Sequence, residues 1–154
     1  MALQTPLSWL QDFVEVSMTP DALAERLTTA GLEVELIEKT GENWSDYCVV
    51  GQISEIRNHP NADSLYLVDV EFGADKPITL VTGAPNIQKM AENLPEPAPK
   101  VALALSGALL IDAYHEDRPL KKLKPAKIRG VASEGMLCSE LELGLSDEHE
   151  GILF

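Results

Sequence analysis

Basic side chains gather in one short segment of this sequence, and such side chains are the ones that bind phosphate. Positions 118–129 hold six of the 12 lysines and arginines and no acidic residue: Arg118, Lys121, Lys122, Lys124, Lys127 and Arg129. Release of counterions from nucleic-acid phosphates supplies much of the affinity at such segments. Lys127 and Arg129 would project from the same face of a regular strand. The segment therefore predicts a strip that contacts phosphates.

The same run has an ordinary explanation. Most charge runs are simply solvated, and lysines on an edge strand prevent edge-to-edge pairing. The chain as a whole carries a net charge of −13, with two basic and seven acidic side chains in residues 1–40 and ten and eighteen in residues 41–154. Such a chain repels RNA at long range unless its positive charge is concentrated on one surface. Composition alone leaves both interpretations open.

The remaining reactive residues form no catalytic or metal-binding pattern. A turn cluster contains His59, Asn61 and Asp63, which we expect to brace that turn. Cys138 and Ser139 lack a neighbouring histidine base, so we expect a core thiol and a helix cap. His149 stands among acidic residues without a zinc-binding motif. No phosphate-cradling glycine loop occurs. We expect no catalytic residue, no metal and no cofactor in this chain.

Period-two alternation dominates the sequence after residue 46 and predicts five short strands. They fall at residues 49–53, 66–72, 78–82, 101–105 and 126–131. Gly51 would permit a bulge or a tight bend, residues 83–86 break the chain, and Ser139 with Glu142 fits the capping box of a short helix closed by Gly144. Five short strands with glycine-rich corners are typical of a small Greek-key barrel such as the OB-fold. The pattern does not distinguish it from an SH3-like barrel.

Residues 1–40 have a different periodicity and predict a helix, a second helix and a strand. Thr19 is a favourable N-cap before Pro20, and Gly31 is a favourable stop. Residues 32–36 then alternate between apolar and acidic side chains, as in a strand with one wet face. A polar linker covers residues 39–46. We therefore expect a mainly β chain, with a small α/β appendage over residues 1–40 and the barrel over residues 41–154.

Composition restricts the cellular setting. No apolar run is long enough to span a membrane, and the first residues lack the basic and apolar pattern of a secretory signal. The two cysteines, Cys48 and Cys138, do not form a disulfide framework and suit a reducing compartment. We expect a cytoplasmic chain without a membrane partner.

Three ordered motifs resemble the tRNA-binding domain of synthetases and of free-standing tRNA-binding proteins, an EMAPII-like OB-fold. They are VGQI at 50–53 with HPNADSL at 59–65, VTGAPN at 81–86, and KIRGV at 127–131 running into SEGMLCS at 133–139. Thr82 departs from the cysteine found in many relatives. The resemblance implies RNA contacts at seven positions: Lys121, Lys122, Lys124, Lys127, Arg129, Asn86 and Ser139.

The two ends of the chain narrow the resemblance further. LSWL at 7–10, LAERL at 23–27, AGLEVE at 30–35 and ELELGLSDEHEGIL at 140–153 are similar to bacterial-type phenylalanyl-tRNA synthetase β chains. The resemblance implies an amino-terminal fragment of a longer chain, in which later segments complete the small domain begun by residues 1–40. It also implies a parent enzyme that charges phenylalanine tRNA, with ATP and magnesium bound elsewhere, and partners in the α chain and the remaining β-chain domains.

Two functions are compatible with these observations. The barrel could bind or position tRNA, or it could be an assembly module of the synthetase that never touches RNA. A free-standing tRNA-binding protein is disfavoured by residues 1–40.

Overall fold

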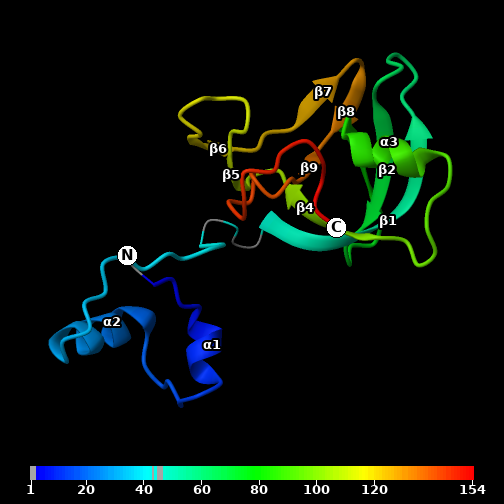
Figure 1. Cartoon of the computed structure of the whole chain (residues 1–154). Helices are drawn as coiled ribbons and strands as arrows, with labels where there is room; N and C mark the ends of the chain where they lie inside the picture. The colour runs from blue at the N-terminus through cyan, green and yellow to red at the C-terminus, as the bar shows by residue number, and fades with distance from the viewer. Residues whose placement is uncertain (1–2, 43, 45–46) are drawn as a thin grey trace. The chain divides into compact units, whose positions relative to one another are not determined.

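The computed structural model describes residues 3–42, 44 and 47–154. The chain divides into two compact units, Met1–Lys39 and Thr40–Phe154 (Figure 1). Three residues of the polar linker predicted at 39–46, namely 43, 45 and 46, lie outside the described residues.

Two helices make up the regular structure of the amino-terminal unit. α1 spans Leu7–Gln11 and follows Pro6, and α2 spans Pro20–Thr29. The hydroxyl of Thr19 accepts a hydrogen bond from the Ala22 amide at 3.3 Å, which confirms the predicted N-cap. The chain leaves α2 through Gly31, whose φ of 94° suits glycine. The local signals in the sequence therefore placed α2 correctly.

The prediction of a strand over residues 32–36 is wrong. This segment forms no strand ladder, and its amide contact is to α2, where the Val34 N–H donates to the Thr28 hydroxyl at 3.1 Å. Alternation shows that one face is apolar, but a strand also needs a neighbour to accept its backbone hydrogen bonds. Leu32 and Leu36 remain exposed.

Five antiparallel strands form the main sheet of the second unit, in the order β3-β2-β1-β4-β9. Their bounds are Cys48–Asn58 for β1, Tyr66–Glu71 for β2, Ile78–Thr82 for β3, Lys100–Leu105 for β4 and Gly135–Leu137 for β9. Contacts of β3 with β9 and with β8 (Val131–Ser133) bring the two ends of the sheet together. The result is a nearly closed barrel consistent with an OB-fold, as the sequence predicted.

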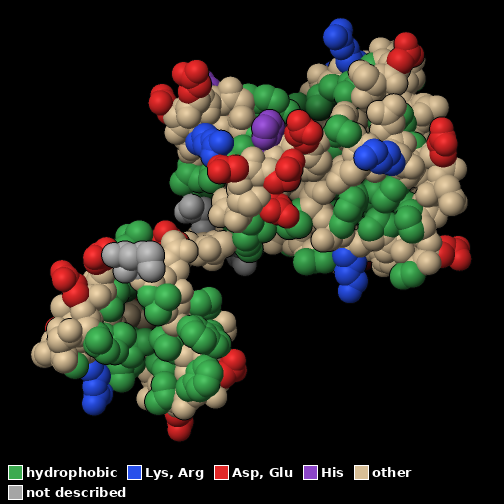
Figure 2. All heavy atoms as spheres, viewed as in Figure 1, with side chains coloured by type: hydrophobic (Ala, Val, Ile, Leu, Met, Phe, Trp, Pro, Cys, Tyr) green, Lys and Arg blue, Asp and Glu red, His purple; other side chains and the backbone are tan. Residues whose placement is uncertain are grey.

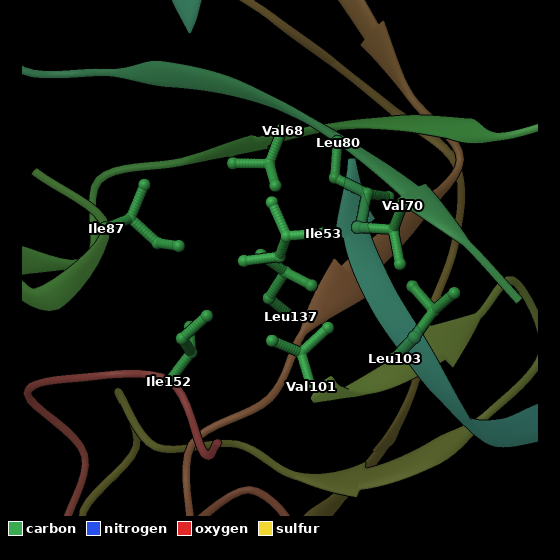
Figure 3. Packing of buried hydrophobic residues seen from close by; sticks show 9 residues of the cluster. All are labelled: Ile53, Val68, Val70, Leu80, Ile87, Val101, Leu103, Leu137 and Ile152. Carbon is green, nitrogen blue, oxygen red and sulfur yellow. The ribbon is translucent and has the colours of Figure 1, made fainter. Parts of the chain in front are cut away.

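The barrel interior is aliphatic (Figure 3). Nine buried side chains form its core: Ile53, Val68, Val70, Leu80, Ile87, Val101, Leu103, Leu137 and Ile152. Val68 and Val70 are alternate residues of β2 and therefore point to the same face of the strand. Ile87 comes from α3 (Pro85–Ala91), a helix between β3 and β4 in the segment that the sequence indicated only as a chain break. Pro85 is the first residue of this helix, a position that tolerates proline because its missing N–H would have no partner there.

The fifth predicted strand, residues 126–131, is two strands. β7 (Ala126–Ile128) pairs with β8 in an antiparallel hairpin turned at Arg129 and Gly130, whose φ angles are 47° and 97°. Two consecutive positive φ values reverse the chain in a two-residue turn, so a single strand cannot pass through these positions. The fifth strand of the barrel sheet is instead β9.

Gly51 does not form a bulge. The irregularity in β1 lies between Ile53 and Glu55. A Cβ on Gly51 would lie 2.3 Å from Cγ1 of Val70, so the glycine makes room for a core side chain. The reason for this glycine is steric.

The carboxyl-terminal segment contains the predicted capping box without the predicted helix. The Ser139 amide donates to the Glu142 carboxylate at 2.7 Å, and the Glu142 amide donates to the Ser139 hydroxyl at 3.3 Å. Residues 140–144 form only a turn, which ends at Gly144 with a φ of 71°. Trp44 is anchored against this turn, because its indole N–H donates to the Leu143 carbonyl at 3.1 Å.

Candidate nucleic-acid interface

The basic segment 118–129 spans parts of two small hairpins. It includes the second strand of the first hairpin and the first strand and turn of the second. β5 (Leu109–Ile111) pairs with β6 (Leu120–Lys122), and β7 follows four residues after β6. Figure 1 shows these short strands beside the main barrel sheet. The structure therefore carries the six basic residues from the β5–β6 loop to the tip of the β7–β8 hairpin.

Two of the six basic side chains are neutralised by carboxylates. Lys121 Nζ lies 2.9 Å from the Asp112 carboxylate, and the Arg118 guanidinium pairs with Asp147. The hydrogen bond from Lys121, aided by the Tyr114 amide, holds the pKa of Asp112 below its ordinary value. The charge that the sequence placed in one run is thus partly cancelled.

The other four basic side chains are exposed: Lys122, Lys124, Lys127 and Arg129. Within the part of the chain that the structure describes, none of the four lies within salt-bridge distance of a carboxylate. Their charges therefore remain available to an anion. We define these four residues as the basic patch.

The relative direction of two patch residues differs from the sequence prediction. Lys127 lies in β7, opposite Ala132, whereas Arg129 lies in the turn with a left-handed backbone. Lys127 and Arg129 were predicted to project from the same face because a regular strand was expected through both positions. The turn at Arg129 interrupts that strand, so the prediction no longer applies. Arg129 is held at the hairpin tip.

The turn between β1 and β2 touches this hairpin, a contact that the sequence did not reveal. His59 Nε2 lies 3.2 Å from the Ile128 carbonyl, and the Asn61 side-chain amide donates to the Arg129 carbonyl at 3.0 Å. The predicted bracing role of His59 and Asn61 therefore extends to a segment nearly 70 positions away. Asp63 is exposed.

Asn86 and Ser139 have internal hydrogen-bond partners. The Asn86 side chain donates to the Ile152 carbonyl at 2.8 Å and accepts from the Ile152 amide at 3.1 Å. Ser139 is only 4% exposed and belongs to the capping box. Neither side chain has a hydrogen bond to a residue of the basic patch. Their predicted role in RNA binding has no support from this geometry.

Aromatic side chains of the barrel unit differ in their exposure. Tyr66 and Phe72 are partly buried against the barrel core. Tyr114 is 94% exposed in the loop between β5 and β6. The four side chains of the basic patch are all charged, a composition suited to phosphate contacts and not to base stacking.

Cys138 and the acidic and histidine side chains are possible reactive or metal-binding groups. Burial raises the pKa of the Cys138 thiol, and the Glu142 carboxylate raises it further, so the thiol stays protonated and unreactive. Over the described residues, no group of three or more histidine, cysteine, aspartate or glutamate side chains could hold a metal ion. No helix in the described part of the chain has the length and hydropathy needed to cross a membrane.

Acidic and basic side chains are both present on the face of the barrel unit seen in Figure 2. The net charge of −13 belongs to the chain as a whole, so local contacts decide where an anion can bind.

The fold defines the class of the second unit as an OB-fold domain, with the basic patch as its candidate ligand surface. Residues 48–104 match the family described as "Putative tRNA binding domain". That match ends before the basic segment begins.

Curated relatives match nearly the whole of this chain. The chain is 47% identical over 151 residues to the phenylalanine–tRNA ligase beta subunit of Dehalococcoides mccartyi strain 195, and 44% identical over 152 residues to that of Synechococcus elongatus. These matches cover 98% and 97% of this chain but 17% of each relative. A crystal structure of the C-terminal domain of Plasmodium vivax p43 matches 58% of this chain and 43% of that chain, with 22% identity and a TM-score of 0.38. By sequence, the chain is similar over nearly its whole length to phenylalanine–tRNA ligase beta subunits, and the matches fit an amino-terminal fragment of one.

Proposed function

We propose that the barrel unit binds tRNA through the basic patch and positions it for a phenylalanine–tRNA ligase. The observation that carries the proposal is the set of four exposed cations on β6, the β6–β7 connection, β7 and the β7–β8 turn, which form no ion pair among the described residues. Lysine and arginine side chains of this kind neutralise phosphates and fix the register of the nucleic acid without reading its sequence. The match of residues 48–104 to a tRNA-binding family supports the same ligand.

The proposal divides the work between this chain and the rest of the enzyme. The parent ligase would join phenylalanine to its tRNA with ATP and magnesium bound elsewhere, in the cytoplasm. The ligase α chain and the remaining β-chain domains would be its protein partners. A patch that contacts only the backbone cannot select phenylalanine tRNA, so selection would come from those other parts.

The test is tRNA binding by the 154-residue chain over a salt series, with two matched triple variants. Lys122/Lys124/Lys127→Ala removes three patch lysines, and Lys76/Lys89/Lys100→Ala removes three exposed lysines elsewhere on the same unit. Both change the net charge equally. We expect only the patch variant to weaken binding and to flatten the salt dependence, by roughly 0.7–0.9 in log–log slope for each phosphate that is no longer neutralised.

Equal weakening in the two variants would show a nonspecific charge effect and contradict the proposal. A wild-type chain that fails to bind tRNA even at low salt would favour the second function, an assembly module of the synthetase. The observation that favours that second function is the apolar surface of the amino-terminal unit, where Trp9, Phe13 and Val14 are at least half exposed.

A further inference from the structure

The turn between β1 and β2 is hydrogen-bonded to the β7–β8 hairpin at two successive backbone carbonyls, those of Ile128 and Arg129. We call these two contacts, made by His59 and Asn61, the His59–Asn61 grip. His59 is 5% exposed, and its ring bridges its own turn and the hairpin. Nδ1 accepts the Asn61 amide at 3.1 Å, so the ring proton lies on Nε2 and is donated to the Ile128 carbonyl at 3.2 Å. This hydrogen-bond network requires one tautomer and one ring orientation.

Asn61 forms the second half of the grip. Its side-chain amide donates to the Arg129 carbonyl at 3.0 Å. A Cβ on Gly130 would lie 3.4 Å from that same amide nitrogen, so the side chain packs closely against the turn. His59 and Asn61 thus hold the two carbonyls that enter the left-handed turn.

The hairpin needs such support because it is short. β7 and β8 have three residues each, and Lys127 at the centre of β7 is exposed. An isolated two-stranded hairpin of this size is marginally stable in water. Ser133 anchors its far end, where the hydroxyl accepts from the Val81 amide at 3.2 Å. The His59–Asn61 grip anchors the end that carries Arg129.

We infer that His59 and Asn61 are positioning residues for RNA binding, which hold the β7–β8 turn so that Lys127 and Arg129 meet the phosphates already oriented. This inference rests on the proposed tRNA contact. A rigid turn avoids the ordering cost that binding would otherwise impose on long charged side chains. Neither residue needs to touch RNA.

The test compares Asn61→Ala with Asn58→Ala in the 154-residue chain. Both asparagines are exposed, but of the two described side chains only Asn61 is hydrogen-bonded to the hairpin. Two readouts are measured: amide exchange and ¹⁵N relaxation of Arg129, Gly130 and Val131, and tRNA affinity. We expect Asn61→Ala to mobilise the turn, leave the amides of β1 and β4 unchanged and weaken tRNA binding roughly two- to tenfold. Asn58→Ala should change neither readout.

His59 provides a conservative rescue. Glutamine can place an N–H near the position of Nε2, whereas leucine cannot donate, so His59→Gln should retain more tRNA affinity and more turn order than His59→Leu. An unchanged turn in Asn61→Ala would overturn the inference, as would a mobile turn with unchanged affinity while Lys127→Ala weakens binding. If the wild-type chain binds no tRNA, the proposed function fails, and the relaxation data still show separately whether the grip exists.

Discussion

At the scale of single residues, Arg129 has a backbone conformation that is unfavourable for a residue with a Cβ atom. Its φ of 47° lies in the left-handed region, which costs an ordinary residue about 1–2 kcal/mol and which asparagine and glycine adopt more easily. The hairpin is therefore destabilised by an arginine at its tip. An exposed guanidinium at a strained position is consistent with a role for its charge.

Arg129→Asn should consequently move stability and binding in opposite directions. We expect the free energy of unfolding to rise by about 0.5–1 kcal/mol as strain is relieved. We expect tRNA affinity to fall, with a salt slope smaller by roughly 0.7–0.9. Urea denaturation and salt-dependent binding measure the two effects.

Arg118→Asn is the matched control for that prediction. Arg118 also has a left-handed backbone, with a φ of 44°, but its guanidinium pairs with Asp147. Its replacement should leave tRNA affinity and its salt slope unchanged. If both variants weakened binding equally, the division between paired and unpaired cations would be wrong.

Gly51 gives a second prediction, for the core. The missing side chain is replaced by the Val70 methyl group, which lies 2.3 Å from where a Cβ would stand. Gly51→Ala should lower the free energy of unfolding by about 1–3 kcal/mol through overpacking, measured by chemical denaturation. In the double variant Gly51→Ala/Val70→Ala, the two single-variant decreases should sum to more than the measured decrease, because the smaller residue removes the clash. Simple additivity would contradict the steric explanation.

At the scale of elements, the β5–β6 hairpin includes an ion pair, between Lys121 and Asp112, whose strength depends on pH. Lys121 lowers the pKa of Asp112 in the folded chain. The pair therefore stabilises the fold at pH values above the ordinary aspartate pKa of 3.8, and this contribution disappears as the pH falls through the lower, folded-state pKa. Acid should weaken this hairpin only after its carboxylate is protonated.

Replacing the lysine should shift that titration. We expect Lys121→Met to raise the pKa of Asp112 towards its ordinary value, observed by carboxyl ¹³C NMR during a pH titration. Lys122→Met is the control, since Lys122 is the next residue of β6 and pairs with no carboxylate among the described residues. Equal shifts in the two variants would mean that general charge, and not the hydrogen bond, lowers this pKa.

The sequence predicted elements well where the local signal was complete. Alternation located β1 to β4, and Thr19 with Gly31 marked the limits of α2. The hairpin turn at Arg129 and Gly130 was missed because the usual first residue of such a turn is asparagine, aspartate or glycine. α3 was missed because the proline that opens it was interpreted as a chain break.

The sequence predicted which basic residues the candidate site contains, but it did not predict how they are arranged or paired. The run of basic residues is visible in the sequence, whereas the carboxylates that cancel part of it are set by the tertiary fold: Asp147 is 29 positions from Arg118. The grip of Asn61 on Arg129 spans 68 positions. Contacts over such separations leave no periodic signal in a single sequence.

At the scale of the whole molecule, the two units differ in how much apolar surface they bury. Neither α1 nor α2 contains a buried residue, and Leu3, Phe13 and Leu36 are each more than 70% exposed. Apolar side chains gather on the visible face of this unit in Figure 2. A unit of about 40 residues has little stability of its own when, as here, none of its described side chains is buried.

Hydrogen exchange should therefore separate the two units. We expect the amides of α1 and α2 to exchange faster than those of β1, β2 and β4 by roughly two orders of magnitude or more, since each 1.4 kcal/mol of local stability slows exchange about tenfold. Mass spectrometry of peptides from residues 3–39 and 48–105 measures both. Equal protection would show that the helices are as stable as the barrel.

The anchored indole of Trp44 gives the molecule an internal optical reporter. The chain has two tryptophans, one in each unit: Trp44 is half-buried and donates a hydrogen bond to the Leu143 carbonyl, whereas Trp9 is 50% exposed and stacks edge-on with Phe13. Fluorescence of a Trp9→Phe chain would follow the unfolding of the barrel through Trp44 alone. Fluorescence of the converse Trp44→Phe chain would follow the unfolding of the amino-terminal unit through Trp9. Each unit therefore has its own fluorescent probe of unfolding.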